Sequence, residues 1–559
     1  MNMQIDWDVP VELSDGLVLR ADVFRPPGAD AFPVILSHGP YAKGLSFQEG
    51  YPVQWGLMVG SHPDVAEGSS NRYQSWEVVD PERWVGHGYA CVRIDSRGAG
   101  RSPGFLDCWS PRETKDLYEC IEWAAAQPWS NGRVGLDGIS YYAINQWQAA
   151  SLQPPHLAAI CAWEGAADHY RDICYHGGIP SRFVGIWYPA QVEKVQHGTG
   201  ERGGRSPVTG ELATGPEVLP DAELARNRVD LAAQASEHPL DDAFHRERSA
   251  DWSRVTVPLL SAANWGGQGL HSRGNFEAFA QAASTQKWLE CHGLEHWTHF
   301  YTEYGRDLQR RFFDHFLKGE DNGWDREPQV LLQVRRPGDR FETRAEREWP
   351  LARTAWTRLY LDAGDRTLVD EPAADATVEY EAGGEGVTFW APRVERETEI
   401  TGPLAATLHV SSSDEDADVF VVVRVFDPDG DEVHFQGTLD PHTPIAQGWL
   451  RASHRKLDPQ RSREWRPFHP HDDVQPLVAG EIYELQVEIW PTCIVLPAGY
   501  RLALTVQGHD YDYGGEPVEM AWFTMRGSGP FVHDSIAGCT VIVHTGRSHP
   551  SSLLLPVIP

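Results

Sequence analysis

RVGLDGISYYA, residues 133–143, is the stretch that decides the fold. Its apolar run ends in Gly138, Ser140 follows after one residue, and INQWQAAS (144–151) continues with helical spacing. A strand that turns directly into a helix, with a serine at the turn, is typical of a nucleophile elbow. The helix dipole favours negative charge developing at that end. Tyr142 stands where the general G-x-S-x-G pattern has its second glycine, so an ordinary strand-to-helix turn is the alternative.

Short apolar runs alternate with helical stretches from Val9 to about Thr302, which predicts a mostly parallel sheet with crossover helices. DLYECIEWAAAQ (116–127) is the predicted crossover helix between two strands. In an open α/β sheet the site lies beyond the carboxyl ends of the strands. The expected buried strands are PVILSH (33–38), YACVRID (89–95), RVGLDG (133–138), HLAAICAWEG (156–165), VPLLSAANW (257–265) and TQKWLECHG (285–293).

The strand pattern disappears between about residues 167 and 247, where 170–196 and 221–234 favour helices. From about residue 346, ATLHVSSS, DVFVVVRVFDPDG, IYELQVEIWP and YRLALTVQG alternate with period two, which predicts an antiparallel sandwich of the jelly-roll kind. We therefore expect an α/β fold in four segments. These are the first part of the core (1–166), a helical cap or lid (167–247), the second part of the core (248–345) and a carboxyl-terminal jelly roll (346–559).

Acidic residues outnumber basic ones: 80 Asp+Glu against 48 Lys+Arg give a formal net charge of −32. Nucleic acids and anionic membranes bind clustered cations, and the chain has no Lys/Arg-rich run, so we expect neither as a partner. The amino terminus lacks the pattern of a secretory signal, and no apolar run is long enough for a membrane span. Eight singly scattered cysteines fit neither a zinc site nor a disulfide scaffold, so we expect a cytoplasmic protein without a bound metal.

Further motifs, in the same order along the chain, resemble those of the cocaine esterase and X-Pro dipeptidyl-peptidase-like family of α/β-hydrolases. The resemblance covers nearly the whole chain. It implies a serine hydrolase that cleaves an ester or amide bond of a small acyl or aminoacyl substrate through an acyl-enzyme, with Ser140 as nucleophile and no cofactor. The motifs are the elbow, VELSDGLVLRADVFRP (11–26), SHGPYAKG (37–44), DSRGAGRSPG (95–104), HPLDDAFHRERS (238–249) and LPAGYRLALTV (496–506).

A serine that attacks a carbonyl group must pass its proton to a base, and a histidine usually serves. The resemblance places this base after the last strand, in CHGLEHWTH (291–299), and favours His296. His299 is the alternative, and we expect His292 to be a loop histidine beside the site.

The acid that orients the base departs from the family pattern. The resemblance expects an aspartate in G-W-x-D after the VPLL strand, but Gly267 stands there. We expect Glu164, at the end of the preceding strand, to replace it, because a carboxylate there needs only to reach the Nδ1–H of the base. A neutral Asn264 that holds the imidazole tautomer, or a dyad without an acid, are the alternatives.

Two donors should stabilise the oxyanion. The elbow supplies the backbone N–H of Tyr141, and the resemblance carries a tyrosine hydroxyl onto Tyr41. Aromatic side chains near the strand ends and in the lid are expected to line an apolar acyl pocket. They are Trp163, Tyr170, Trp187 and Trp265.

Other functions stay open. The resemblance includes X-Pro dipeptidyl-peptidases and amino-acid ester hydrolases, which need an acid for the substrate ammonium group. His292-Gly-Leu-Glu-His296 matches the H-x-x-E-H zinc pattern, but that pattern works only on a helix, and an apparent strand precedes it here. The missing aspartate also allows an inactive hydrolase fold that acts as a binding module. A homo-oligomer is compatible with the sequence.

Overall fold

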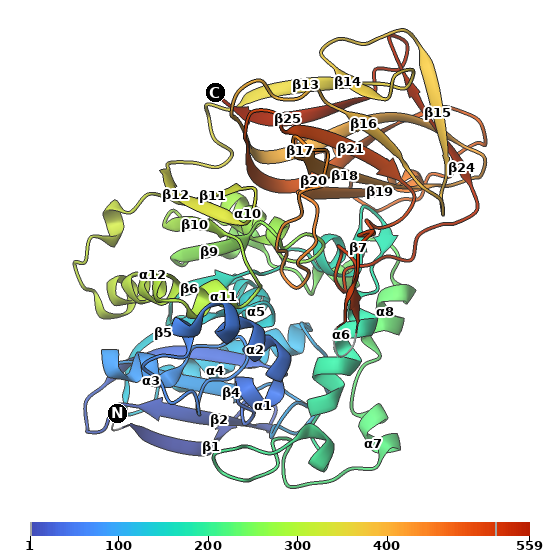
Figure 1. Ribbon diagram of the computed structural model, residues 1–559. Coiled ribbons are helices and arrows are strands. Elements are labelled where there is room, and N and C mark those ends of the chain that lie inside the picture. Colours follow the sequence, from blue (N-terminus) through green and yellow to red (C-terminus); the bar gives the residue numbers. More distant parts are fainter. Residues whose placement is uncertain (1–2, 520–522) are drawn as a thin grey trace.

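The computed structural model of the chain describes residues 3–519 and 523–559. Two large sheets organise these residues: a ten-stranded sheet that ends at residue 346 and an eleven-stranded sheet that begins at residue 355 (Figure 1). No helix in the described ranges has the length and apolar character needed to cross a membrane.

The ten-stranded sheet has the order β1-β2-β4-β3-β5-β6-β9-β10-β11-β12. Its neighbouring strands from β4 to β11 run parallel, and antiparallel β1, β2 and β12 lie at the edges. The six strands expected from the sequence are present as β3, β4, β5, β6, β9 and β10. The strands are β1 (Gln4–Glu12), β2 (Val18–Arg25), β3 (Phe32–Gly39), β4 (Ala90–Asp95), β5 (Ser130–Ile139), β6 (Leu157–Trp163), β9 (Leu259–Asn264), β10 (Lys287–His292), β11 (Val330–Arg336) and β12 (Arg340–Glu346).

Helices follow the strands and cover the sheet. The predicted crossover helix is α4, and it begins at Pro111 rather than Asp116. It starts earlier because the Ser110 side chain accepts a hydrogen bond from the Glu113 N–H, and proline is well suited to the first helical position. The helices around this sheet are α1 (Phe47–Gly50), α2 (Pro52–Ser61), α3 (Pro81–Trp84), α4 (Pro111–Ala125), α5 (Tyr141–Ser151), α10 (Ser272–Gln281), α11 (Thr298–Tyr301) and α12 (Glu303–Phe313).

The segment between β6 and β9 leaves the sheet as an insertion of short elements. A continuous helix over 170–196 was predicted, but the chain turns at Gly177 and Gly178, both with positive φ. A Cβ at Gly177 would lie 2.0 Å from the carbonyl oxygen of Trp449, so this turn also permits a close backbone approach to the carboxyl-terminal domain. The elements are a π-helix (His169–Cys174), β7 (Tyr175–His176), β8 (Ile179–Pro180), α6 (Phe183–Trp187), α7 (Asp221–Arg226), α8 (Leu231–Glu237) and α9 (Ala243–Arg246).

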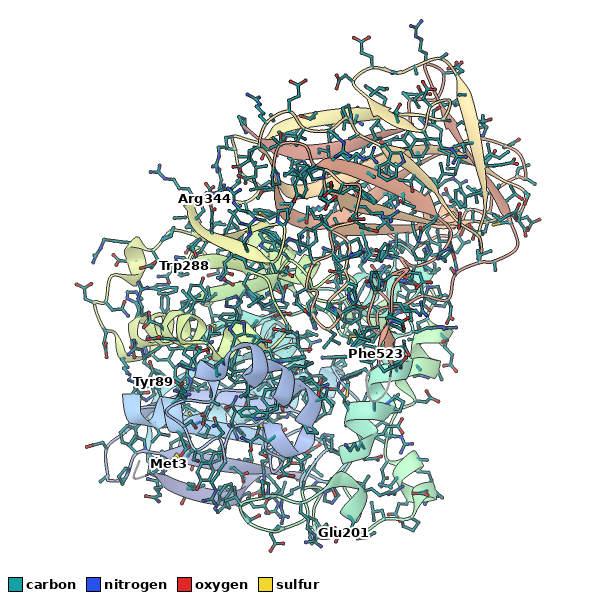
Figure 2. All side chains as sticks on the ribbon, viewed as in Figure 1. Met3, Tyr89, Glu201, Trp288, Arg344 and Phe523 are labelled. Carbon is teal, nitrogen blue, oxygen red and sulfur yellow. The ribbon has the colours of Figure 1, made fainter. Side chains whose placement is uncertain are left out.

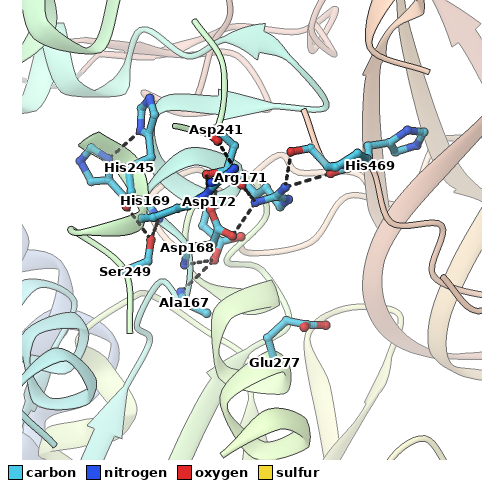
Figure 3. A network of polar contacts seen from close by, with 12 residues as sticks. Ala167, Asp168, His169, Arg171, Asp172, Asp241, His245, Ser249, Glu277 and His469 are labelled. Carbon is cyan, nitrogen blue, oxygen red and sulfur yellow. Dashed lines mark hydrogen bonds and ion pairs between the residues drawn. The ribbon is translucent and has the colours of Figure 1, made fainter. Parts of the chain in front are cut away.

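Arg171 ties this insertion to the carboxyl-terminal domain (Figure 3). Its guanidinium donates at 2.8 Å to Asp168 and to Asp241 within the insertion, and at 2.9 Å to the carbonyl oxygen of His469. The two carboxylates and the carbonyl offset the cost of burying this cation, which is almost fully buried. Arg171 therefore holds parts of the insertion together and also holds the insertion against the carboxyl-terminal domain.

The eleven-stranded sheet has the order β15-β24-β17-β20-β19-β18-β21-β16-β14-β13-β25. β25, the last strand of this order, also pairs with β17, so the sheet closes on itself through β17, while β15 and β24 lie outside the closed part. The four strands expected from the alternating pattern are present as β17, β18, β20 and β21. The strands are β13 (Ala355–Asp362), β14 (Thr367–Val369), β15 (Ala376–Glu381), β16 (Val387–Trp390), β17 (Thr398–Ser412), β18 (Asp418–Phe426), β19 (Ala446–Arg451), β20 (Tyr483–Leu496), β21 (Arg501–Gln507), β24 (Thr540–Thr545) and β25 (Ser552–Ile558).

An apolar interface joins the two sheets. Trp265, Leu289 and Val330 from the first sheet pack in one buried cluster with Val495 and Ile558 from the second. At the same edge the guanidinium of Arg344 on β12, labelled in Figure 2, bonds both carboxylate oxygens of Glu399 on β17 at 2.6 and 2.7 Å. The contact places loops of the strand domain beside the carboxyl ends of the core strands.

Candidate active site

Ser140 lies between β5 and α5 with φ 57° and ψ −112°. A non-glycine residue in this region costs on the order of 1–3 kcal/mol and persists where the surroundings fix it. The Ile139 N–H bonds Glu77 O and the Ser140 N–H bonds Trp163 O, both at 3.0 Å, so the turn is held on two sides. This is the geometry of a nucleophile elbow.

Tyr142 replaces the second glycine of the general elbow pattern without breaking the turn. Gly39 at the end of β3 supplies the room, because a Cβ there would lie 2.6 Å from Cε1 of the Tyr142 ring. Gly138 is also required, because a Cβ on it would lie 2.5 Å from the Tyr142 Cβ. The departure from the pattern is thus compensated by glycines on neighbouring strands.

Ser140 opens into a pocket whose free space, with the solvent at its mouth included, is about 560 Å³. Its wall is mostly aromatic and aliphatic, and it is built by the core, the insertion and the strand domain together. The lining residues are Tyr41, Gln54, Trp76, Glu77, Trp109, Ser140, Ile144, Ile173, Phe183, Trp187, Gln191, Leu270, His271, His296, Thr438, Leu439 and Phe531. A concave, mostly apolar pocket with a few polar groups is typical of a small-molecule site.

The histidine that contacts Ser140 is His271. Its Nε2 lies 3.5 Å from the Ser140 Oγ. His271 follows β9 and precedes α10, so it belongs to the loop in which the family pattern has its aspartate. The His271 ring stacks on the ring of His296, with centroids 4.7 Å apart and planes 15° apart.

His296, the predicted base, has carboxylates on both ring nitrogens. Its Nδ1 lies 2.9 Å from Glu164 Oε2, as the orienting role of Glu164 requires, and its Nε2 lies 2.9 Å from Glu77 Oε1. The other Glu164 oxygen lies 3.1 Å from His292 Nε2. His292 ends β10 and His296 lies in a turn, so the segment is not the helix that the zinc pattern requires. The Asn264 amide donates to Glu164 at 3.2 Å and does not hold an imidazole.

Charges around these rings move their pKa values in opposite directions. Burial by itself would lower the pKa of His296, but Glu164 and Glu77 raise it to about 9. Burial would raise the pKa of Glu164, but His296 and His292 lower it to about 2. Burial and the adjacent His296 lower the pKa of His271 well below its usual value. These opposite shifts favour a cationic His296 beside a neutral His271.

Tyr41 and Tyr141, the predicted oxyanion donors, lie side by side, with ring centroids 5.9 Å apart. The Tyr41 hydroxyl accepts a hydrogen bond from Trp187 Nε1 at 3.0 Å, which leaves its own proton free to donate. Tyr141 is the first residue of α5, so its N–H has no acceptor within the helix. The Tyr141 hydroxyl donates to Glu113 at 2.5 Å.

Of the four aromatic residues expected to line the pocket, Trp187 does so. The other three are buried and outside the lining. The Tyr170 hydroxyl donates to Pro239 O, the Trp265 indole donates to Gln333 O, and the Trp163 ring packs against the His292 ring. His299, the alternative base, is also outside the lining; its ring lies beside the His292 ring, with centroids 5.2 Å apart.

Two site residues were missed by the sequence analysis: His271 and Glu77. The resemblance places the base in the loop after the last strand, whereas GGQGLHSRG (266–274) has a histidine in the loop that lacks its aspartate. Glu77 lies in a stretch without strand or helix, before α3, and no sequence pattern marks it.

Three buried side chains of the insertion bring potential metal ligands within 4.8 Å of one another: His169, Cys174 and His245. The two histidine Nδ1 atoms are 2.9 Å apart, a hydrogen-bond distance (Figure 3). The Cys174 Sγ lies 3.8 and 3.9 Å from the two ring nitrogens of His169, so it faces the ring and not the lone pair of Nδ1. Zinc needs each ligand atom about 2.0–2.3 Å away, along its lone pair, and this arrangement fits a buried hydrogen bond better.

A serine elbow at the carboxyl edge of a parallel sheet, beside histidines and a buried carboxylate, defines an α/β-hydrolase. The family model of X-Pro dipeptidyl-peptidase (S15 family) matches residues 15–301, and that of the X-Pro dipeptidyl-peptidase C-terminal non-catalytic domain matches residues 322–554. The chain therefore belongs to the X-Pro dipeptidyl-peptidase (S15) family and is a serine hydrolase.

Individual relatives agree with this assignment. The crystal structure of a CocE/NonD family hydrolase from Staphylococcus aureus is 33% identical, with a TM-score of 0.86 over 100% of this chain and 94% of that chain. Cocaine esterase from Rhodococcus sp. (strain MB1 Bresler) is 25% identical over 100% of this chain and 99% of its own. An α-amino acid ester hydrolase, 16% identical, shares the fold with a TM-score of 0.68 over 99% of this chain and 96% of that chain.

Proposed function

We propose that this protein hydrolyses an ester or amide bond of a small acyl substrate through an acyl-enzyme on Ser140. The observation that carries the proposal is the strained Ser140, which opens into a mostly apolar pocket with a histidine nitrogen 3.5 Å from its Oγ. In such a site the serine oxygen attacks the carbonyl carbon, and the Tyr41 hydroxyl and Tyr141 N–H receive the oxyanion.

The histidines then complete the cycle. A base takes the Ser140 proton and returns it to the leaving group, after which water, activated by the same base, releases the acid. The predicted base is His296, oriented by Glu164. The 2.9 Å contact between His296 Nδ1 and Glu164 supports the orienting role of Glu164. The other ring nitrogen, Nε2, bonds Glu77 and not Ser140.

The cavity supports an aromatic or aliphatic acyl group. Trp76, Trp109, Trp187, Phe183 and Phe531 all contribute to its wall, and flat apolar groups pack well against such rings. A panel of aryl and alkyl esters with acyl groups of increasing size tests this preference.

An aminoacyl substrate is the second candidate, and Glu77 favours it. This carboxylate lies in the cavity wall, bonds His296 through one oxygen, and has its other oxygen buried without a hydrogen-bond partner among the described residues. A substrate ammonium group would satisfy that oxygen. The α-amino acid ester hydrolase that shares this fold is named for substrates of this class.

The finer organisation is part of the same proposal. The insertion, expected at 167–247, would act as a cap, because Ile173, Phe183 and Trp187 line the cavity. The closed strand order at 346–559 supports a jelly roll. All eight cysteines are unpaired and buried, which supports a reducing compartment such as the cytoplasm.

Labelling with a fluorophosphonate probe tests the nucleophile. We expect an adduct on Ser140, found by mass spectrometry, and the same adduct with a chelator present. Ser140→Ala should abolish both the adduct and the turnover of aryl esters while the thermal unfolding temperature stays close to that of the wild type. Turnover retained in Ser140→Ala would contradict the proposal, and a folded wild type that gains no adduct would favour a binding module.

A further inference from the structure

Two histidines line the cavity beside Ser140, and their ring nitrogens differ in what they contact. Both nitrogens of His296 lie 2.9 Å from carboxylate oxygens of Glu164 and Glu77. Because a carboxylate accepts hydrogen bonds, contacts of this kind on both nitrogens favour an imidazolium, which has no free lone pair. In this arrangement His296 has no site at which to accept a proton from serine.

His271 has the free site that His296 lacks. Its Nε2 faces the Ser140 Oγ at 3.5 Å, and its ring is held by stacking on His296 at 4.7 Å. The ring is 2% exposed, and no carboxylate bonds it. A separation of 3.5 Å is longer than a hydrogen bond in a working site, but such contacts often shorten only when substrate binds.

We infer that His271 is the general base for Ser140, and that His296 is a positioning residue whose cation, held by Glu164 and Glu77, supports the His271 ring. The inference rests on Ser140 being the nucleophile proposed above. It moves the base from the loop after β10 to the loop after β9, where this chain has Gly267 in place of an aspartate.

The proton and electron pairs balance in the usual way. The Ser140 O–H bond breaks, its proton goes to His271 Nε2, and the Oγ forms a bond to the carbonyl carbon while the C=O π pair moves to the oxyanion. When the tetrahedral intermediate collapses, the bond to the leaving group breaks and that group takes the proton from His271 Nε2. Water repeats the sequence in the second half.

The charged surroundings explain why the two rings hold different protonation states. Burial and the His296 cation lower the pKa of His271, and burial raises the pKa of Glu77 against its hydrogen bond with His296. Glu164 stays ionised and stabilises the His296 cation. The titratable groups around the pair are of two kinds. The acids and the histidine are Glu77 from the loop before α3, Glu164 after β6, and Glu290 and His292 on β10. The remaining groups are buried phenols whose pKa values Glu77 helps to raise: Tyr41, Tyr51, Tyr142 and Tyr301.

The pH profile of the wild type separates the two bases. If neutral His296 were the base, kcat/KM would rise about tenfold per pH unit until its pKa of about 9. With neutral His271 as the base, we expect kcat/KM to change less than about threefold between about pH 7 and about 9. The background rate of Ser140→Ala is subtracted at each pH. A steep rise to about pH 9 would overturn the inference.

Matched substitutions give the second test. His271→Asn should lower kcat/KM by about 10³-fold or more, and His271→Gln should do the same if the first variant folds poorly. His296→Asn should lower kcat/KM less, by about 10- to 100-fold. It should also move the acid limb of the pH profile to higher pH, because the neighbouring cation no longer lowers the pKa of His271. His156→Asn is the control, since His156 is half exposed and pairs with Glu122 on the surface.

The outcomes distinguish this inference from the proposed function. Fluorophosphonate labelling of wild-type Ser140 confirms the nucleophile independently of the base. Suppose that the wild type is labelled and that His271→Asn is labelled and turns over substrate at the wild-type rate. If His296→Asn is then neither labelled nor active, His296 is the base and the inference is wrong. If the folded wild type is not labelled, the proposed function fails first.

Discussion

Removing the Glu164 charge should destabilise the protein in a pH-dependent way. Glu164 is fully buried and contacts His296 at 2.9 Å, His292 at 3.1 Å and the Asn264 amide at 3.2 Å. Burial would raise its pKa, but His296 and His292 lower it from 4.5 to about 2, which corresponds to about 3 kcal/mol of stability at pH values above 4.5. Glu164→Gln keeps the shape and removes the charge, so we expect the free energy of unfolding to fall by about 3 kcal/mol.

The pH dependence has a definite sign. The lowered pKa of Glu164 contributes stability above pH 4.5 that is lost as the pH falls toward about 2. The raised pKa values of His292 and His296 contribute stability below pH 6.5 that is lost as the pH rises through about 9. The cluster should therefore stabilise the wild type most between pH 4.5 and 6.5, and the alkaline loss should be smaller in Glu164→Gln.

Guanidinium denaturation followed by tryptophan fluorescence, at about pH 6 and about pH 9, measures both effects. Turnover should fall about 10- to 100-fold as well, because His296 loses its main partner. Glu277→Gln is the control: Glu277 pairs with Arg466 away from the cavity, so the variant should keep its activity and the wild-type pH slope. A Glu164→Gln protein as stable as the wild type at about pH 6, or a stability difference between the two proteins that grows between about pH 6 and about pH 9, would refute the reasoning.

Two further substitutions test the assignments around the cavity. Tyr41→Phe should lower kcat by about 10²- to 10³-fold with KM nearly unchanged, because the hydroxyl would act only on the oxyanion; an unchanged kcat would remove Tyr41 from that role. Trp265→Ala should lower the free energy of unfolding by about 3–5 kcal/mol in chemical denaturation and leave kcat within about threefold, because Trp265 packs between the sheets. A raised KM without loss of stability would instead show that Trp265 contacts the substrate.

Strands and the elbow could be predicted from the sequence because their signals are local. The apolar runs of β3 to β10 and the strand-to-helix turn at Ser140 depend on neighbouring residues in the chain. The contact between Glu164 and His296 could also be predicted, because both residues follow strands whose carboxyl ends meet at one edge of the sheet.

Long-range packing decided the features that were missed. The helical pattern expected over 170–196 is interrupted because the Gly177 turn fits against the Trp449 backbone, 272 residues further along the chain. Trp265 looked like a pocket residue because it follows a strand, but the second domain covers it. His271 reaches Ser140 because of the path that the loop after β9 takes. Hydrophobic periodicity predicts strands and helices but not the path of a loop, so this contact could not be predicted.

The hairpin around Thr438 gives the cavity a wall that belongs to the strand domain. The Thr438 N–H bonds Gly266 O at 3.0 Å and the His296 N–H bonds Thr438 O at 2.9 Å. Gly266 allows this approach, since a Cβ there would lie 2.5 Å from the Gly437 Cα. Relatives could thus change their substrate range by altering a hairpin more than 100 residues from any group that reacts. A chimera that exchanged only the strand domain would inherit the chemistry of one parent and part of the selectivity of the other.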